Sequence, residues 1–498
     1  MLLFLKKKFN IEEYFIYDVI FQNRRKKMEK FFKVKEKGST VKIEIMAGVT
    51  TFMAMAYILM VNAGMFADPF GDGTNVLGVS YGAIYIATAI SAVVGTVLIG
   101  LLSNLPLAQA SGMGLNAFFV YTVCVGLGLS YANALVLVLL DGVVFIVLTL
   151  TGLRKMIFEA IPDAVKKAIP AGIGLFIAFL GLQNAGIVVN SDSTLVNLVS
   201  FNLLGTATWA SIMPVLVTIF GLFAIAILSK RNVKGAILWG ILGSAVVYYA
   251  LGFTIPGFYD GFVASLSFNP LDSFKAFGTE AVFKVFTEGF DFSSYIASNG
   301  TANLVLVIVT SALAFCLVDM FDTMGTLYGA CARGGLLDEN GDIPNMNKAM
   351  IADAVATTTG AICGTSTVTT FVESSAGVAE GGRTGLSAMV TAALFFVAMF
   401  LSPVAQLIPS CATATALIYV GILMVNCVKD IDWTDVEVGV PAFLAMALMP
   451  FTYNISYGIA FGLIAYIIIK LGMGKIKDIK VGTWIIGIMF AVMFFVTH

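Results

Sequence analysis

The sequence contains a single histidine, His498, which is its last residue. This excludes Ser-His and Cys-His catalytic pairs, zincin motifs and clusters of histidine metal ligands. No P-loop motif is present, so any transport must run on a gradient or be passive. The six cysteines show no metal-binding spacing, which favours thiols that pack against helices or lipid. We therefore expect no enzyme activity, no cofactor and no metal.

Charged residues are also scarce. They make up 12% of the chain, compared with about 25% in a soluble domain, whereas 59% of the residues are hydrophobic. Apolar runs of about 18 or more residues recur along the whole length, which is typical of membrane-spanning helices. The net charge of −1 gives no indication of a nucleic-acid partner. The composition predicts an all-α polytopic membrane protein that has the lipid bilayer as its partner.

The apolar runs predict fourteen transmembrane spans. Their expected positions are residues 43–63, 82–102, 105–125, 132–153, 168–188, 208–228, 234–252, 303–329, 349–363, 366–380, 384–402, 412–428, 437–452 and 454–472. With a cytoplasmic N-terminus, the basic sites between spans fall mostly inside, as the positive-inside rule requires. The loop at 189–207 then lies outside and contains no Lys or Arg. A last apolar piece at 484–496 either lies at the interface or crosses as a fifteenth helix.

The first 40 residues are basic and interspersed with aromatic side chains, so we expect them in the cytoplasm. They do not resemble a cleavable signal, because the apolar run after Met1 is too short and basic residues follow it. Met28 is an alternative start.

Three acidic residues stand out against apolar surroundings. The stretch 304–328 carries Asp319 and Asp322 and no basic residue, and Glu373 is the only charge in 365–378. A charge at bilayer depth costs roughly 2.5–3.5 kcal/mol on insertion scales, so such residues persist where they bind a substrate, carry a proton or pair with another charge. Because no Lys or Arg lies nearby, we expect these acids to carry protons or to hold a polar ligand.

Two of the expected spans, 105–125 and 366–380, begin as extended polar chain and continue as half a helix. Such backbone at bilayer depth is tolerated only where it faces protein or a water-filled cavity. These are the third and tenth spans, seven apart, and two such breaks indicate a transporter site between inverted repeats. A short similarity between residues 234–243 and 457–465 supports the same repeat.

Four motifs occur in order along the chain. They are AGVTTFMAMAYILMVN at 47–62, GMGLNAF at 112–118, DMFDTMGT at 319–326 and VESSAGVAEGGRTG at 372–385. Together they resemble the AzgA-like purine permeases, the hypoxanthine/guanine/adenine branch of the nucleobase–cation symporter-2 family, from about Met28 to the C-terminus. The sequence departs from that family at Ala63 and Ser111, where proline is usual, and at Asp141, where a small polar residue is expected.

The resemblance implies fourteen spans in a seven-plus-seven inverted repeat. A core domain (41–153 and 303–402) would move against a gate domain (168–252 and 412–472). The other parts would be the cytoplasmic segment 1–40, an extracellular loop at 253–302, and a basic linker with the apolar piece at 473–498. The implied activity is uptake of a purine base by proton symport at the cell membrane, with Na⁺ less favoured than H⁺. A homodimer is plausible for this architecture, and the preferred purine stays open.

The resemblance also implies roles for individual residues. Glu373 corresponds to the span-ten glutamate that holds the base, Asp322 to the span-eight acid at the site, and Asp319 to the acid one turn before it. Asn116 and Gly114 correspond to span-three positions of the site. Asp322, Asp319 and Glu373 are the candidates for proton coupling.

The residues themselves suggest further contacts. Glu373 can accept hydrogen bonds from a purine N–H and an exocyclic amine together, or it can cap its own half-helix. Thr51 and Thr370 are candidate substrate contacts, and Phe371 can stack on the ring or simply pack. Weaker candidates are Thr367, which could donate or accept a hydrogen bond, and Phe52 and Phe118, which could stack on the ring.

The remaining charges near the motifs have open alternatives. Asp319 and Asp322 share a helix face, and desolvation and mutual repulsion should make at least one of them harder to ionise. One of them can instead simply hydrogen-bond to the backbone of the first span or to Thr50 or Thr51. Asp141 is expected to be structural or interfacial, and Glu380 and Arg383 are expected to pair with each other or with water.

Other classes of protein fit less well. An anion carrier would need a basic or neutral site, and a carrier of uracil or xanthine would keep the fold with another cargo. An intramembrane aspartyl protease needs two aspartates on separate helices and a Gly-x-Gly-Asp sequence, which is absent. A channel has no need of broken helices that carry buried carboxyl groups. We therefore favour purine symport.

Overall fold

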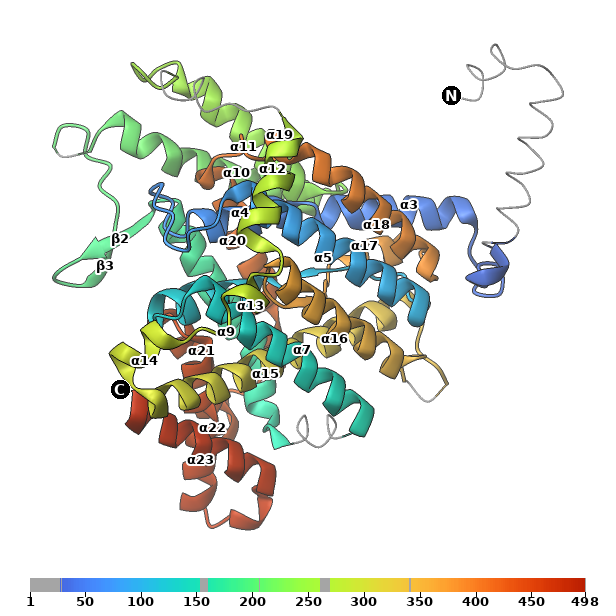
Figure 1. Ribbon diagram of the computed structural model, residues 1–498, viewed down its shortest axis with the longest axis vertical. Coiled ribbons are helices and arrows are strands. Elements are labelled where there is room, and N and C mark those ends of the chain that lie inside the picture. The colour runs from blue at the N-terminus through green and yellow to red at the C-terminus, as the bar shows by residue number, and fades with distance from the viewer. Residues whose placement is uncertain are drawn as a thin grey trace.

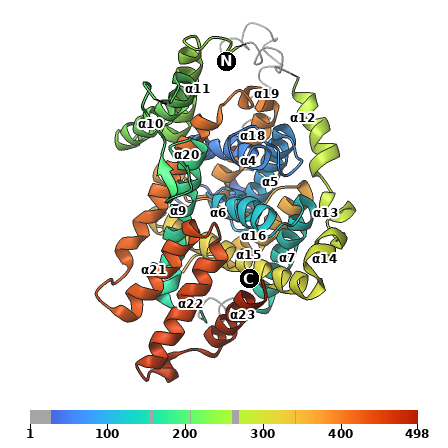
Figure 2. The ribbon, with the colours of Figure 1, turned by 90° about the vertical axis from the view of Figure 1, so that its left-hand side faces the viewer.

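The computed structural model describes residue 27 and residues 29–152, 160–205, 207–259, 269–339 and 342–497 (Figures 1 and 2). Most of the basic segment 1–40, expected in the cytoplasm, lies outside the described residues.

Nine helices of the described part are long and apolar enough to cross a membrane. They are Val41–Ala67, made of α3 (Val41–Met55) and α4 (Tyr57–Ala67), then α5 (Tyr81–Leu102), α7 (Tyr131–Thr151), α9 (Asp163–Asn184), α10 (Trp209–Lys230), α15 (Thr301–Gly334), Gly385–Ala405, which begins with α18 (Gly385–Ala398), Ser410–Asp430, which begins with α20 (Ser410–Val425), and α22 (Ile455–Gly472). The shorter apolar helices are α6 (Met113–Ala117) continued by the π-helix η1 (Phe118–Gly126), α11 (Ala236–Gly252), α21 (Val436–Phe451) and α23 (Val481–Thr497). The chain is thus a polytopic helical membrane protein, as its composition predicts.

Local sequence sets many of the helix ends. Thr40, Ser80 and Ser130 cap α3, α5 and α7, because each side-chain oxygen accepts a hydrogen bond from the backbone N–H three residues later. Thr208 and Ser211 form a reciprocal capping box at α10. These caps explain why the helices begin close to the expected span boundaries.

The helices form two groups, which we call the crossing bundle and the flanking bundle. The crossing bundle contains α3 to α7, α15, α16 (Met346–Cys363), α17 (Ser374–Ala379) and α18, with two short strands. The flanking bundle contains α9, α10, α11, α20, α21 and α22, which pack on one another. Figure 2 shows α9, α20, α21 and α22 on one side and α5, α7 and α16 on the other.

The strands β1 (Gln109–Ser111) and β4 (Val368–Thr370) lie inside the crossing bundle and pair antiparallel. Main-chain hydrogen bonds extend the pairing at both ends, from Gly112 N to Thr367 O (3.0 Å) and from Phe371 N to Ala108 O (3.1 Å). Each strand leads into a short helix, α6 after β1 and α17 after β4. The pairing satisfies backbone polar groups that would otherwise be unpaired in a buried place.

The expected extracellular loop at 253–302 is largely helical where it is described. It forms α12 (Pro270–Ala276), the π-helix η3 (Phe277–Ala281), α13 (Lys284–Thr287) and α14 (Ser293–Asn299). These pack on α5, α7, α16 and α15, and Figure 2 shows them along the outer edge of the crossing bundle. The expectation of a simple loop did not include these helices.

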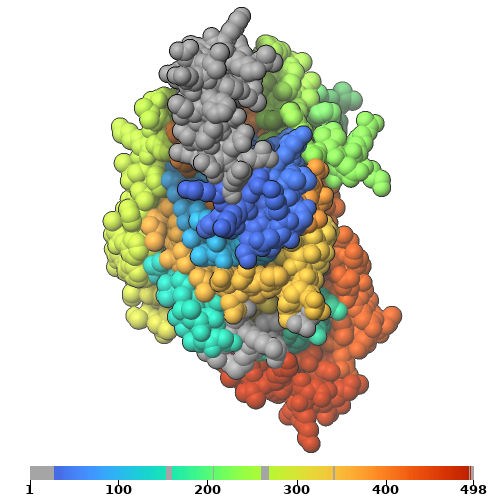
Figure 3. All heavy atoms as spheres, turned by 90° about the vertical axis from the view of Figure 1, so that its right-hand side faces the viewer, coloured from blue at the N-terminus to red at the C-terminus, as the bar shows by residue number. Residues whose placement is uncertain are grey.

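The residues before α3 are anchored on the crossing bundle. Phe32 and Val34 pack with Leu386 of α18, and Asn104 Nδ2 donates to Phe32 O (3.0 Å). Figure 3 shows this N-terminal part of the described chain, in blue, on the surface beside the orange segments.

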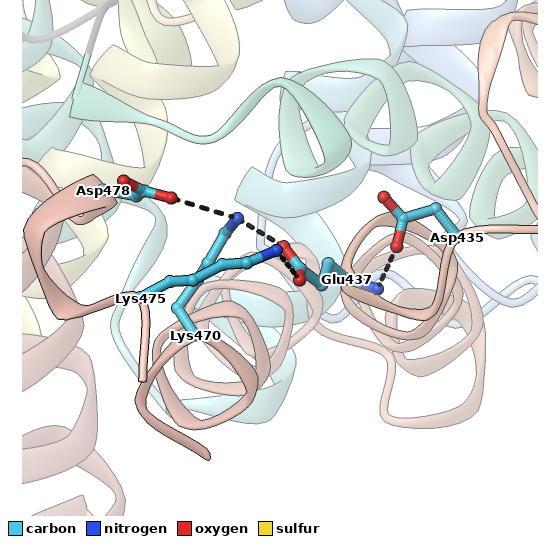
Figure 4. Close-up of polar contacts among 5 residues, drawn as sticks. All are labelled: Asp435, Glu437, Lys470, Lys475 and Asp478. Carbon is cyan, nitrogen blue, oxygen red and sulfur yellow. Dashed lines mark hydrogen bonds and ion pairs between the residues drawn. The ribbon is translucent and has the colours of Figure 1, made fainter. Parts of the chain in front are cut away.

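Charged residues tie the end of the flanking bundle to α23. Glu437 in the first turn of α21 accepts from Lys470 (2.5 Å) and from Lys475, and Lys470 lies 3.9 Å from Asp478 (Figure 4). This cluster holds the linker from which α23 emerges. The helix then packs on α22 and α15, so it contacts both bundles.

Candidate functional site

Glu373 lies between β4 and α17. Its carboxylate Oε1 accepts a hydrogen bond from Tyr57 Oη at 2.7 Å, and its side chain is only partly buried. Glu373 is the N-cap residue of α17, yet its side chain makes no capping hydrogen bond. The alternative that Glu373 only caps its own half-helix is therefore wrong.

Asp322 lies on α15 and faces β4. Its Oδ2 accepts a hydrogen bond from Thr369 Oγ1 at 3.2 Å, and it is partly buried, like Glu373. Both of the residues that the sequence identifies as most important thus lie at β4, because Asp322 bonds to Thr369 of the strand and Glu373 follows the end of the strand.

Three more acids lie behind β4, and each is fully buried at 0% exposure: Asp141 on α7, Asp319 on α15 and Asp353 on α16. Asp141 accepts from Thr367 (3.1 Å), and Asp319 accepts a long hydrogen bond from Thr357 (3.4 Å). Among the described residues, no hydrogen bond joins Asp319 to the backbone of the first span, to Thr50 or to Thr51, so that alternative is not seen.

Asp353 has the fullest set of partners. It accepts from Gln109 Nε2 (2.8 Å), from Thr323 Oγ1 on both oxygens (2.9 Å each) and from Thr370 Oγ1 (3.4 Å). Sequence reasoning missed this residue, although part of the signal that singles out Asp319 also applies to it: Asp353 is the only charge in the expected span 349–363. Asp353 therefore joins both strands to α15 and α16.

The span-three candidates are buried. Asn116 Nδ2 donates to Ser111 O (3.3 Å), whereas its Oδ1 has no hydrogen-bond partner among the described residues. Gly114 packs against α9 of the flanking bundle, because an added Cβ would lie 2.5 Å from Ile173 Cγ2. The structure gives Asn116 an unused acceptor and gives Gly114 a packing role.

The other candidates lie around the strands. Thr51 is buried against Gly377 of α17, and its hydroxyl has no partner among the described residues. Thr370 is buried, and its hydroxyl is already bonded to Gln109 and Asp353. Phe371 is buried in the main apolar core.

The expectation that Glu380 and Arg383 pair with each other is wrong. Glu380 pairs with Lys234 Nζ at 2.7 Å, on the loop before α11, and not with Arg383. Arg383 instead donates to the carbonyl oxygens of Val378 (2.7 Å) and Gly382 (2.8 Å). The helix packing places Lys234 near α17, which no local pattern indicates.

No basic side chain balances the acids of the site. None of the ion pairs found within the described ranges involves Asp141, Asp319, Asp322, Asp353 or Glu373. The same ranges hold no cluster of His, Cys, Asp or Glu suited to a metal ion. The arrangement can offer carboxyl oxygens to an uncharged ligand with N–H donors, and it can hold protons.

Comparisons with known proteins agree with the sequence motifs. A model of a permease family (Xan_ur_permease) matches residues 42–461. The guanine/hypoxanthine permease PbuO of Bacillus subtilis is 39% identical, over 93% of this chain and 99% of its own length. The adenine permease AdeP of Escherichia coli is 36% identical, over 93% of this chain and 95% of its own length.

Solved structures show the same fold at low sequence identity. The transmembrane domain of the cyanobacterial bicarbonate transporter BicA superposes with a TM-score of 0.56 at 15% identity, over 83% of this chain and 96% of that chain.

Proposed function

The chain belongs to this permease family and is a transporter rather than an enzyme, and on that premise we propose that it takes up purine nucleobases by proton symport. The cargo would be hypoxanthine, guanine or adenine, the bases named for its relatives. The membrane would be the cell membrane, with the N-terminus in the cytoplasm.

One observation carries the proposal. Glu373 and Asp322 present two partly exposed carboxyl groups beside β4, and each has one oxygen bonded by a protein hydroxyl. The oxygens that remain are acceptors, so they suit the N–H groups of an uncharged heterocycle. Asn116 Oδ1 and the Thr51 hydroxyl are further unused groups, and Phe371 would line the site. Thr370 and Gly114 would support these residues from behind.

Proton coupling would use the same acids. Carboxyl groups without a basic partner are costly to ionise in a buried place, so protonation from outside and release inside would accompany transport. Asp322 and Glu373 would meet the base and the proton, and Asp319 would act one turn before Asp322 on α15. Na⁺ is the less favoured ion.

The architecture supports a moving-domain mechanism. The crossing bundle corresponds to the proposed core domain and the flanking bundle to the proposed gate domain. The proposal includes fourteen spans in two inverted repeats of seven, with extended segments in spans three and ten, and an elevator-like movement of the core domain. A homodimer, to be tested by light scattering of the purified protein, belongs to the same proposal.

A competition panel tests the cargo. Uptake of radiolabelled hypoxanthine is measured in cells that lack purine uptake, against adenine, guanine, xanthine and uracil, with and without a protonophore. We expect competition by purine bases and loss of accumulation with the protonophore. Competition by uracil alone, or accumulation that is insensitive to the protonophore, would reject the corresponding part of the proposal.

Two variants test the site. Glu373→Gln should abolish uptake without loss of protein from the membrane, and Asp322→Asn should impair proton-linked accumulation. The control is Glu288→Gln on the outer helices, which removes a carboxylate paired only with Lys284. Normal uptake by Glu373→Gln would disprove its role in holding the base, and unchanged pH dependence in Asp322→Asn would disprove its role in coupling.

A further inference from the structure

The hydroxyl of Tyr57 has a different kind of hydrogen-bond partner from the hydroxyls of three other buried tyrosines in the crossing bundle. Tyr85, Tyr121 and Tyr131 each donate to a backbone carbonyl, at 3.0, 2.6 and 2.5 Å. Tyr57 donates to the carboxylate of Glu373 at 2.7 Å. A tyrosine that bonds to backbone braces the fold, whereas Tyr57 acts on a side chain of the proposed site.

We propose that Tyr57 is a positioning residue that fixes the Glu373 carboxylate for binding of the base. This inference rests on the proposed function and adds a residue to it. The distance of 2.7 Å is that of a well-formed O–H···O hydrogen bond, and such a bond is stronger when its acceptor is ionised. The bond therefore suits an ionised Glu373 that is held in one orientation.

The two partners of this hydrogen bond differ in burial. Tyr57 is 1% exposed, whereas Glu373 is only partly buried. The hydroxyl thus reaches Oε1 from the protein interior and leaves Oε2 without a partner from Tyr57. A base that enters the site can use the outer side of a carboxylate that is already oriented.

Glu373 needs such an external support. Its own helix, α17, is six residues long and receives no capping bond from the Glu373 side chain. A glutamate has several rotatable bonds, and fixing them during binding costs affinity unless the protein has fixed them beforehand. Tyr57 can supply this preorganisation.

Tyr57 is itself firmly placed. It is the first residue of α4, directly after the single residue Ala56 that separates α3 from α4, and its ring belongs to the main apolar core. The preceding helix, α3, packs on α17, and its Thr51 lies against Gly377. The hydrogen bond from Tyr57 therefore couples the position of α3 and α4 to the carboxylate of Glu373, which lies 316 residues away in the chain.

The test is uptake kinetics of Tyr57→Phe in the full chain. Losing a hydrogen bond to a charged group should raise KM for the base by roughly tenfold to a hundredfold, with Vmax, membrane abundance and thermal stability close to wild type. Tyr85→Phe is the matched control, because it removes a buried hydroxyl bonded to Ala398 O and should leave KM unchanged. An unchanged KM in Tyr57→Phe, or an equal rise in Tyr85→Phe, would overturn the inference.

A second measurement separates positioning from folding. Binding of radiolabelled base is measured on the purified, monodisperse fraction of each variant, so that yield does not enter. Tyr57→Phe should weaken this binding by the same factor by which it raises KM, whereas Tyr85→Phe should leave it unchanged. Wild-type affinity in the purified Tyr57→Phe protein would overturn the inference. Absence of purine uptake by the wild type would instead disprove the proposed function, independently of Tyr57.

Discussion

The crossing bundle and the flanking bundle are both built of apolar helices, but they bury different groups. All four fully buried acids of the described part, Glu44, Asp141, Asp319 and Asp353, lie in the crossing bundle. In the flanking bundle the ionic contacts lie at the rim, as the cluster around Glu437 shows (Figure 4). The crossing bundle therefore gives up stability by burying polar groups, and these groups provide specificity.

Close backbone contact occurs in both bundles, since an added Cβ on Gly385 of α18 would lie 2.0 Å from Gly100 O of α5, but in the described part of the flanking bundle it is not accompanied by buried acids. Gly421 of α20 and Gly174 of α9 face each other so closely that an added Cβ on Gly421 would lie 2.4 Å from Gly174 O. Small residues allow such approach between membrane helices, where packing replaces the hydrophobic effect as the main source of stability. The comparison teaches that similar hydropathy can encode a polar site in one bundle and a rigid support in the other.

Asp353→Ala should show the largest effect, because it breaks the polar network of the crossing bundle. The change leaves the donors of Gln109 and Thr323 without their acceptor, and each orphaned donor costs about 1–3 kcal/mol. We expect a loss of about 3 kcal/mol or more in the free energy of unfolding, seen as a lower Tm of the purified protein. Asp192→Ala in the exposed hairpin between β2 (Val188–Ser191) and β3 (Leu195–Leu198) should leave Tm unchanged. A wild-type Tm for Asp353→Ala would mean that the network is not stabilising.

Gly421→Ala should damage the flanking bundle by a different mechanism. The new methyl group meets the backbone of Gly174, which cannot turn aside, so the helices must separate. Overpacking of this kind costs typically about 1–3 kcal/mol. Gly243→Ala on α11 is the control, since nothing lies within 4 Å of its added Cβ, and helix propensity predicts a gain of up to about 1 kcal/mol. Equal Tm values for the two variants would remove the contrast between the bundles.

Local features of the chain predict the helices well. Residues 454–472 are expected as a span and α22 runs from Ile455 to Gly472, because an apolar run follows the capping residue Asn454. The motif resemblance to purine permeases is confirmed by the family match and the relatives. The motifs also identify Glu373 and Asp322 as site candidates, whose carboxyl groups accept hydrogen bonds from Tyr57 and Thr369.

Contacts between distant segments could not be predicted in the same way. Tyr57 looks like any aromatic residue of an apolar span, and only folding places it against Glu373. The pair formed by Lys234 and Glu380 joins the two bundles, so neither local sequence contains it. Thr370 was expected at the substrate because of its place in the polar stretch, whereas its hydroxyl is bonded to Asp353.

Gly114→Ala sharpens the comparison at the contact between the bundles. The added Cβ would lie 2.5 Å from Ile173 Cγ2, a stiff β-branched side chain of α9, so a loss of about 1 kcal/mol in stability is expected. The double variant with Ile173→Ala should be less destabilised than the sum of the single variants, because the second change removes the clashing methyl group. Tm values of the four proteins give the coupling energy, and additive effects would show that this contact does not join the bundles.

Lys234→Ala should have the smallest effect, although its ion pair with Glu380 also links the two bundles. The side chains are 43% and 34% exposed, so water and salt screen the attraction across the 2.7 Å contact. Pairs of this kind contribute about 0.2–1 kcal/mol, and a double-mutant cycle with Glu380→Gln should give a coupling in that range that shrinks at high salt. The salt dependence matters more than the size, because a coupling that persists in 1 M salt would indicate a desolvated pair. In that case the ion pair between the bundles would be as strong as the buried polar contacts within the crossing bundle. The contrast between a polar interior and a screened rim would then not hold for this ion pair.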